Sequence, residues 1–179
     1  ALYNRWVPIG AQIRERLEDC CIRTTFLTGF PGESDEQAAR TLDFMQKIQP
    51  DWSGCFAYSR EEDTPAALLK NRVPKKKALE REKKLQTTQE KITAQRLSTR
   101  VGKIYPVLIE EIVQNSDESQ EDGLAIGRSW FQAPEVDGNF VVSYDSKNKE
   151  ALSAVVPGTI VNAKARAVTG VDIDSELVL

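Results

Sequence analysis

The feature that most constrains the fold is residues 23–34, RTTFLTGFPGES, where an apolar run meets a turn rich in glycine and proline. The β-branched and aromatic residues predict a strand that is buried on both faces, as inside a parallel sheet. Gly29 and Gly32 allow positive φ angles or close approach to a ligand, and Pro31 stiffens the turn. Ser34, with a glutamine three residues later, predicts the capping box of a helix. Ligands of parallel α/β folds lie at the carboxyl ends of strands, although a tight turn alone also accounts for both glycines.

The composition excludes several kinds of chemistry. The 179 residues contain no histidine, which excludes imidazole acid–base catalysis and histidine-ligated zinc. The three cysteines, Cys20, Cys21 and Cys55, follow no metal-ligand spacing and fit a reducing compartment. The sequence shows no run of about 18 apolar residues and no signal-peptide pattern. We therefore predict no membrane partner and a cytoplasmic location, or the stroma or matrix of an organelle.

The first 70 residues read as one strand–helix unit followed by another strand. The expected elements are the end of a helix at 12–19, a strand at 22–28, a helix at 34–49 and a strand at 54–58. Two parallel strands leave long unpaired apolar edges, which makes a poor independent fold. This segment is therefore predicted to be the last part of a larger parallel, TIM-like α/β barrel.

Residues 71–102 are predicted to form a helical connector. Pro74 suits a helix start, and residues 75–100 contain no further glycine or proline. Apolar or small residues recur every seven positions and predict one thin buried seam, formed by Ala78, Leu85, Ile92 and Thr99. The lysine run at the helix start is more simply solvated surface than a nucleic-acid contact.

Residues 103–179 change to the two-residue period of strands. Five strands are expected, at 105–113, 123–130, 140–144, 159–168 and 177–179, separated by good turn sequences. This pattern predicts a small all-β, OB-like antiparallel barrel. The segment holds 6 Lys+Arg against 13 Asp+Glu, a formal charge of −7. The sign favours a basic protein over a phosphate backbone as partner, although an acidic surface without any partner is also common.

Two segments together resemble a known family. Residues 23–34, followed by FAYS at 56–59 and TPA at 64–66, resemble the late strands of the radical S-adenosylmethionine methylthiotransferases. The C-terminal barrel resembles the TRAM domain that follows in those enzymes. Within the family, GRSWFQAPEVDG at 127–138 resembles the RimO type, which modifies an aspartate of a small-subunit ribosomal protein.

The resemblance implies an activity, cofactors and a partner. The complete family enzyme uses S-adenosylmethionine and two 4Fe-4S clusters to methylthiolate the β-carbon of that aspartate. Its partner is expected to be a basic small-subunit ribosomal protein, with tRNA less favoured. The clusters need thiolates in a fixed arrangement, including a Cys-x-x-x-Cys-x-x-Cys loop, which this sequence lacks. The chain is thus expected to ligate neither cluster and to be inactive alone, as the C-terminal part of a longer enzyme.

Two other functions remain open from the sequence. One is a tRNA methylthiotransferase of the MiaB type, which binding of RNA by the barrel would distinguish. The other is a truncated, non-catalytic scaffold or assembly subunit that retains the TRAM barrel.

The resemblance also suggests binding residues, and it assigns no catalytic residue and no metal ligand to this chain. Those expected near the adenosine part of S-adenosylmethionine are Thr25, Gly29 and Tyr58. Those expected to bind the partner protein are Arg128, Trp130, Phe131, Glu135 and Asp137. The aromatic pair would supply contact energy and the acids would steer association. The alternative is that one ring of the pair packs in the barrel core while the other lies idle on the surface.

Overall fold

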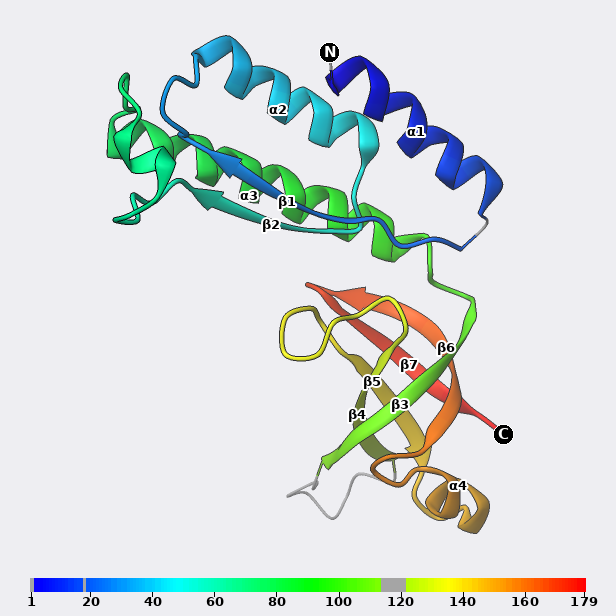
Figure 1. Ribbon diagram of the computed structural model, residues 1–179. Helices are drawn as coiled ribbons and strands as arrows, with labels where there is room; N and C mark the ends of the chain where they lie inside the picture. Colours follow the sequence, from blue (N-terminus) through cyan, green and yellow to red (C-terminus); the bar gives the residue numbers. More distant parts are fainter. Residues whose placement is uncertain (1, 18, 114–121) are drawn as a thin grey trace. The chain divides into compact units, whose positions relative to one another are not determined.

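The computed structural model describes residues 2–17, 19–113 and 122–179 (Figure 1). The chain divides into two compact units, Ala1–Thr93 and Ala94–Leu179. The boundary lies inside the long helix that begins at Lys75, so most of that helix belongs to the N-terminal unit. In the described ranges, no helix is both long enough and apolar enough to cross a membrane.

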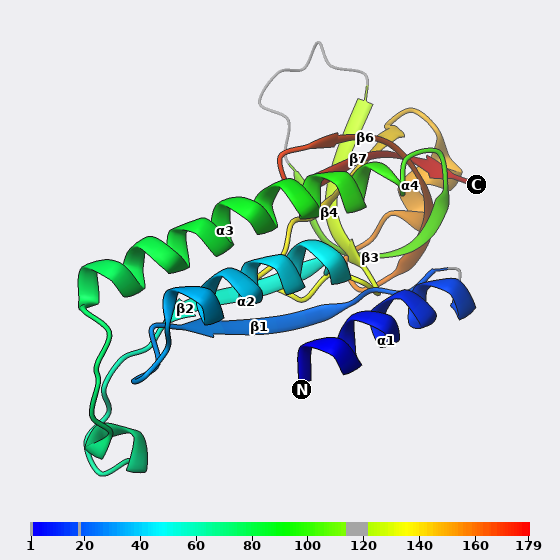
Figure 2. The same cartoon turned by 90° about the horizontal axis from the view of Figure 1, so that it is seen from above.

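The N-terminal unit combines helices with a two-stranded sheet. Its elements are α1 (Leu2–Arg16), β1 (Arg23–Thr28), α2 (Asp35–Ile48), β2 (Trp52–Ala57), the 3-10 helix η1 (Pro65–Leu68) and α3 (Lys75–Ser98). The strands run parallel, with Phe26 opposite Cys55. Seen from above, α2 lies between α1 and α3 (Figure 2). The sequence located β1, β2, α2 and α3 to within a few residues, and α1, whose end was expected at 12–19, ends at Arg16.

The burial of the sheet corrects the expectation of a strand covered on both faces. Phe26 is buried, whereas its neighbour Leu27 is 50% exposed and Phe56 on β2 is 54% exposed. The reason is that the helices of this unit pack on one face, where Phe26 and Cys55 join Met45 and helix residues of α3 in a core. The described residues of this unit form a sheet of two parallel strands and no complete TIM-like barrel.

Helix α3 is anchored to the sheet by a seam and by a buried polar network. The predicted seam is confirmed at Ala78, Leu85 and Ile92, which are buried, with the last two in the same core cluster, whereas Thr99 is exposed. Beside it, the Gln89 Nε2 donates a hydrogen bond to the carbonyl of Pro50 at 2.9 Å. The Thr93 hydroxyl donates to the Asp51 carbonyl at 2.8 Å. These bonds satisfy backbone carbonyls at the start of β2, which would be costly to leave unpaired in a buried position.

The C-terminal unit is a closed five-stranded barrel. Its elements are β3 (Ile104–Val113), β4 (Asp122–Ser129), β5 (Phe140–Asp145), α4 (Lys149–Ala154), β6 (Ile160–Thr169) and β7 (Asp172–Val178), in the order β3-β4-β5-β7-β6. Its interior is filled by fully buried side chains, among them Val107, Ile109, Phe140, Val142 and Ile173. The predicted small OB-like barrel is therefore confirmed.

Three details of the barrel differ from the expectation. The β5–β7 pair is parallel, so the barrel is not wholly antiparallel. Strand β7 starts five residues before the expected 177, because Ile173 and Ser175 face inward while Asp172 and Asp174 alternate with them. Helix α4 was not expected; the side chain of Asn148 caps it by accepting hydrogen bonds from backbone N–H groups of its first turn.

Candidate functional site

The turn after β1 has the local geometry that its sequence predicts. Gly29 and Gly32 have φ angles of 75° and 89°, in the region that favours glycine. The Ser34 hydroxyl accepts a hydrogen bond from the Gln37 N–H, and the Gln37 side chain accepts one from the Ser34 N–H. This is the predicted capping box. A Cβ added at Gly29 would lie 2.4 Å from the Cβ of Ala78, so only glycine allows α3 to approach this closely.

A carboxylate that the sequence analysis passed over holds the turn in place. Glu33 Oε2 accepts hydrogen bonds from the Gly29 N–H at 2.6 Å and from the Thr28 hydroxyl at 3.1 Å. The Arg81 guanidinium of α3 lies 2.5 Å from the same oxygen, and its other terminal nitrogen lies 2.8 Å from Asp35. A glutamate directly after a turn that exposes backbone N–H groups was the available signal for this contact. The two charged groups tie the turn to α3.

The same cluster lowers the pKa of a carboxyl group. Lys77 donates a hydrogen bond to Asp35 at 2.7 Å, and Arg81 donates a second one at 2.8 Å. These bonds, Lys77's foremost, hold the pKa of Asp35 below its ordinary value. The Asp35 carboxylate is thus favoured as the charged form at the first turn of α2, where the helix dipole also favours an anion.

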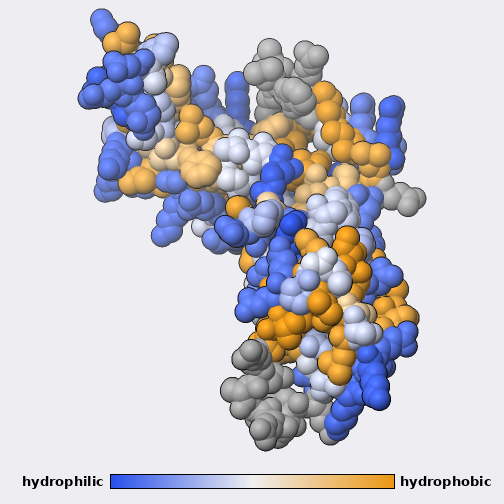
Figure 3. All heavy atoms as spheres, turned by 60° about the horizontal axis from the view of Figure 1, so that its bottom comes forward, coloured by the Kyte–Doolittle hydropathy of each residue, from blue (hydrophilic) through white to orange (hydrophobic). Residues whose placement is uncertain are grey.

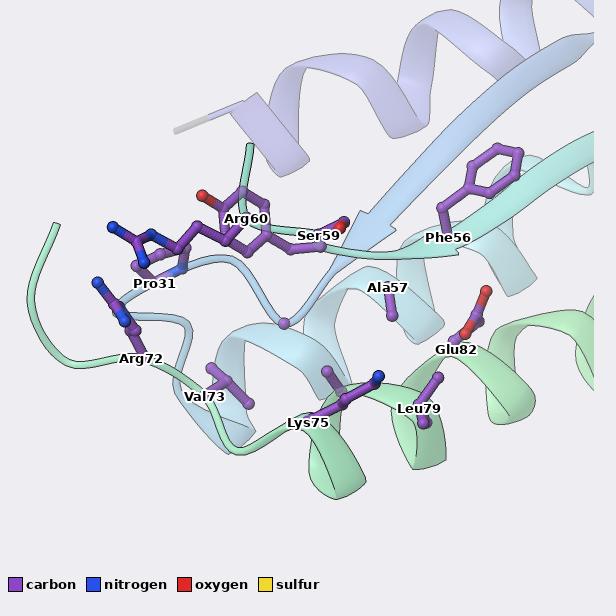
Figure 4. Close-up of a pocket in the computed structure, with 13 residues that line it drawn as sticks. Pro31, Phe56, Ala57, Ser59, Arg60, Arg72, Val73, Lys75, Leu79 and Glu82 are labelled. Atoms are coloured by element: carbon purple, nitrogen blue, oxygen red, sulfur yellow. The ribbon is translucent and has the colours of Figure 1, made fainter. Parts of the chain in front are cut away.

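A pocket of about 470 Å³ opens at the carboxyl ends of β1 and β2, beside the start of α3 (Figure 4). Gly29 lines it from the turn, Phe56 and Tyr58 from the end of β2, and Leu79 and Glu82 from α3. The Tyr58 N–H donates to the Thr28 carbonyl at 2.8 Å, which keeps the two strand ends together. The pocket lies at the end of the sheet where parallel α/β folds bind ligands.

The structure brings together two of the three residues expected to contact the cofactor. Gly29 and Tyr58 line the pocket, whereas Thr25 lies on the exposed sheet face, paired with Gly54, outside the pocket lining. The Tyr58 ring packs edge-on against Phe30, with centroids 5.2 Å apart. Its hydroxyl oxygen is buried and has no hydrogen-bond partner among the described residues. A ligand with an aromatic ring and polar edges, such as an adenosine, fits this lining.

An iron–sulfur cluster does not fit the described residues, among which no three cysteine, histidine or carboxylate side chains are grouped to hold a metal. Burial raises the pKa of the Cys55 thiol, which disfavours the thiolate that a cluster needs. Cys20 and Cys21 precede β1, at the opposite end of that strand from the pocket.

The loop after β4 carries the aromatic pair expected to bind a partner. Phe131 is only 4% exposed, and its ring packs against Tyr105 and Phe140 with centroids 5.3 and 5.9 Å away. The Arg100 guanidinium lies 3.8 Å from the Phe131 ring centroid. Trp130, in contrast, is 52% exposed. The buried position of Phe131 does not suit a direct partner contact, and the pair alternates between core and surface.

The polar residues of this loop have distinct positions. Arg128 pairs with Glu110 across the barrel surface at 2.7 Å. Asp137 accepts a hydrogen bond from the Ala133 N–H at 2.7 Å and so shapes the loop. Glu135 is exposed, with a φ angle of 61°. Figure 3 shows apolar side chains at the barrel surface. Whether these residues bind a partner remains a prediction.

Comparison with known proteins gives matches that include residues of both units. Residues 101–178 match the TRAM domain family. A ribosomal protein uS12 methylthiotransferase RimO from Treponema denticola is 46% identical over 155 residues, which cover 86% of this chain and 32% of that protein. Proteins of the same name from Synechococcus sp. and Carboxydothermus hydrogenoformans are 38% and 37% identical, over 93% and 78% of this chain. The chain spans about a third of the length of these relatives.

Proposed function

This chain belongs to the RimO-type methylthiotransferases, and we propose that it is the C-terminal portion of an enzyme that methylthiolates an aspartate β-carbon of ribosomal protein uS12. The observation that supports this most strongly is the 38% identity to a uS12 methylthiotransferase over 93% of the chain, because an alignment of that extent includes both units. The tRNA-modifying and scaffold alternatives are not favoured, since these relatives are named for uS12.

In this proposal the N-terminal unit is the last part of a TIM-like barrel and contributes to cofactor binding. The exposed face with Leu27 and Phe56 is the face that further strands of the complete protein would cover. Gly29 and Tyr58 would hold the adenosine of S-adenosylmethionine in the pocket, with Thr25 facing the barrel interior. When bound to a 4Fe-4S cluster, this cofactor supplies radical chemistry, and the cluster ligands would lie elsewhere in the complete protein.

The C-terminal barrel would dock the ribosomal protein. The formal charge of −7 on residues 103–179 suits a basic partner, and Trp130 offers an exposed aromatic contact. Arg128, Glu135 and Asp137 border that contact in sequence. An enzyme that acts on ribosomal protein would work where ribosomes are, in the cytoplasm or in the stroma or matrix of an organelle.

The test is the reaction of the complete protein. Anaerobically reconstituted full-length protein is incubated with S-adenosylmethionine and either purified uS12 or bulk tRNA, and the products are analysed by mass spectrometry. We expect one methylthio group on an aspartate of uS12 and none on tRNA, with a reaction lacking S-adenosylmethionine as control. Modification of tRNA alone would contradict the proposal in favour of the MiaB type. A cluster-free protein that binds uS12 without reaction would favour the scaffold.

A further inference from the structure

One end of the pocket carries a group of positively charged side chains. Arg60, Arg72 and Lys75 line the pocket together with the residues expected near the cofactor. Figure 4 shows Arg60 and Arg72 at the same end, with Glu82 at the other. Within the described ranges, Arg60 forms no ion pair or side-chain hydrogen bond, and both arginines are exposed. A guanidinium that is placed at a pocket and lacks an internal partner is available to a ligand.

The two arginines reach the pocket from the two ends of one braced loop. Residues 59–72 leave β2 and return to α3, with Arg60 near the start and Arg72 at the end. The Asn71 carbonyl accepts a hydrogen bond from the Gly32 N–H at 2.8 Å, which fastens the loop to the turn after β1. Arg72 donates to the Ala67 carbonyl at 3.2 Å, within the same loop. The loop is therefore preformed, which lowers the entropy cost of binding a ligand between its ends.

The surrounding charges indicate which kind of anion fits. Three acids, at 61–63, directly follow Arg60, and Glu82 closes the other end of the pocket. A phosphate backbone would meet these carboxylates and be repelled. A single acidic residue within an otherwise basic polypeptide matches this arrangement of charges. Its carboxylate would face the two arginines, and its basic neighbours would face the acids at 61–63 and Glu82. The planar fork of a guanidinium also suits a carboxylate with two parallel hydrogen bonds.

We propose that Arg60 and Arg72 bind the side-chain carboxylate of the residue to be modified in the polypeptide substrate. This inference rests on the proposed function, which supplies the aspartate, while the structure supplies the position of the arginines. Because the pocket also contains Gly29 and Tyr58, the bound carboxylate would lie next to the cofactor site. The arginines thus select an acidic target and present its β-carbon to the cofactor.

The experiment uses full-length protein and two fluorescent peptides, one spanning the target aspartate of uS12 and one with asparagine in its place. Binding is measured by fluorescence anisotropy at low salt. We expect the wild type to bind the aspartate peptide about tenfold more tightly, as for a charge-assisted bidentate contact. Arg60→Gln and Arg72→Gln should each reduce this preference and the double variant should abolish it, with the asparagine peptide bound as before. Arg40→Gln, an exposed arginine of α2 outside the pocket lining, should keep the preference.

Other results of these binding measurements would contradict the inference or the proposed function. Equal affinity of the wild type for both peptides, or a preference that survives in the folded double variant, overturns the inference and leaves the proposed function intact. Failure of the wild type to bind either peptide counts against the uS12 substrate itself. S-adenosylmethionine affinity is measured by calorimetry in parallel. A double variant that loses this affinity but keeps the aspartate preference would assign the arginines to the cofactor's carboxylate and overturn the inference.

Discussion

At the scale of single residues, the ion pair between Glu33 and Arg81, here called the clamp, fastens the turn at Gly29 to α3 at the edge of the pocket. The Glu33 and Arg81 side chains are only 11% and 10% exposed, so the ion pair is shielded from solvent. Removing Arg81 would leave the Glu33 carboxylate buried without its charged partner, whereas removing Glu33 leaves Arg81 paired with Asp35. The clamp also satisfies the Gly29 N–H at the point where the chain turns toward the pocket. Stability and pocket shape are therefore coupled through one carboxylate.

We expect Glu33→Gln to lower the free energy of unfolding of the N-terminal unit by about 1.5–3 kcal/mol, because Arg81 loses a charge-assisted hydrogen bond and retains the ion pair with the exposed Asp35. Urea unfolding of the 179-residue chain, followed by far-ultraviolet circular dichroism, measures the change. Asp43→Asn is the matched control. It removes the same charge from a pair with Lys47 that is about half exposed, and such pairs contribute about 0.3–0.5 kcal/mol. Equal effects of the two substitutions would refute the clamp.

The lowered pKa of Asp35 predicts a pH dependence. Because the folded-state pKa lies below the unfolded value, the stabilisation is complete above the unfolded value of 3.8 and is lost as the pH falls through the folded pKa. Wild type should therefore be more stable than Asp35→Asn at neutral pH, and the difference should shrink in the acid range. Thermal unfolding of both proteins from pH 7 down to about pH 3 tests this. A difference that stays constant over the range would contradict it.

At the scale of elements, the structure shows where each fold unit begins. Leu97 is 1% exposed and Arg100 is 3% exposed, and Arg100 stacks on Phe131 in the barrel. The barrel thus includes the end of α3 and the residues that follow it. Conversely, the N-terminal core needs Leu85 and Ile92 from α3.

We expect a fragment of residues 94–179 to fold alone and to be about 2–5 kcal/mol more stable than residues 103–179, which lack Leu97 and the Arg100 stacking contact. Residues 1–70 should remain unfolded, because they lack the part of the core contributed by α3. Urea unfolding of the barrel fragments and amide NMR dispersion of the 1–70 fragment are the measurements. Arg128→Ala in the 94–179 fragment is the control, with a loss below about 1 kcal/mol, since its ion pair is part-exposed. Equal stability of the barrel fragments would place the boundary at 103.

Sequence patterns over a few residues predicted the helices and strands better than they predicted what packs against each of them. The capping box at Ser34 and the apolar seam of α3 depend on residues that lie three to seven positions apart in the sequence, so the sequence located both helices. The parallel β5–β7 pair and the one-sided burial of β1 depend on what packs against each strand, which spacing does not encode. For the site, Gly29 and Tyr58 were predicted to lie together. Arg60 and Arg72 were missed because the loop that brings them to one pocket is set by distant contacts.

At the scale of the whole molecule, the chain spans about a third of its relatives and divides into a unit with a pocket and an acidic barrel. In the proposed function these units have separate tasks. The pocket would select the residue to be modified, and the barrel would hold the protein that carries it. Steering by a net charge acts over a Debye length of about 8–10 Å, so it affects association more than the chemistry in the pocket.

The last prediction concerns this docking. Of the loop residues expected to bind the partner, Glu135 is exposed, whereas Asp137 shapes the loop through its bond to the Ala133 N–H. Glu135→Gln in the full-length protein should therefore slow association with uS12 about two- to fivefold at low salt and reduce the salt sensitivity, with little change in the dissociation rate. Trp130→Ala should instead accelerate dissociation, because an exposed aromatic ring gains most when an interface desolvates it.

Stopped-flow association at two salt concentrations separates these effects. Glu150→Gln removes the same charge from α4, away from the loop, and serves as the control. If Glu150→Gln slows association as much as Glu135→Gln, then steering comes from the net charge of the barrel and the loop is not a specific docking site. If neither Trp130→Ala nor Glu135→Gln changes either rate while the barrel remains folded, the partner does not bind at this loop. If Glu135→Gln changes mainly the association rate and Trp130→Ala mainly the dissociation rate, the loop is assigned as the contact that positions uS12.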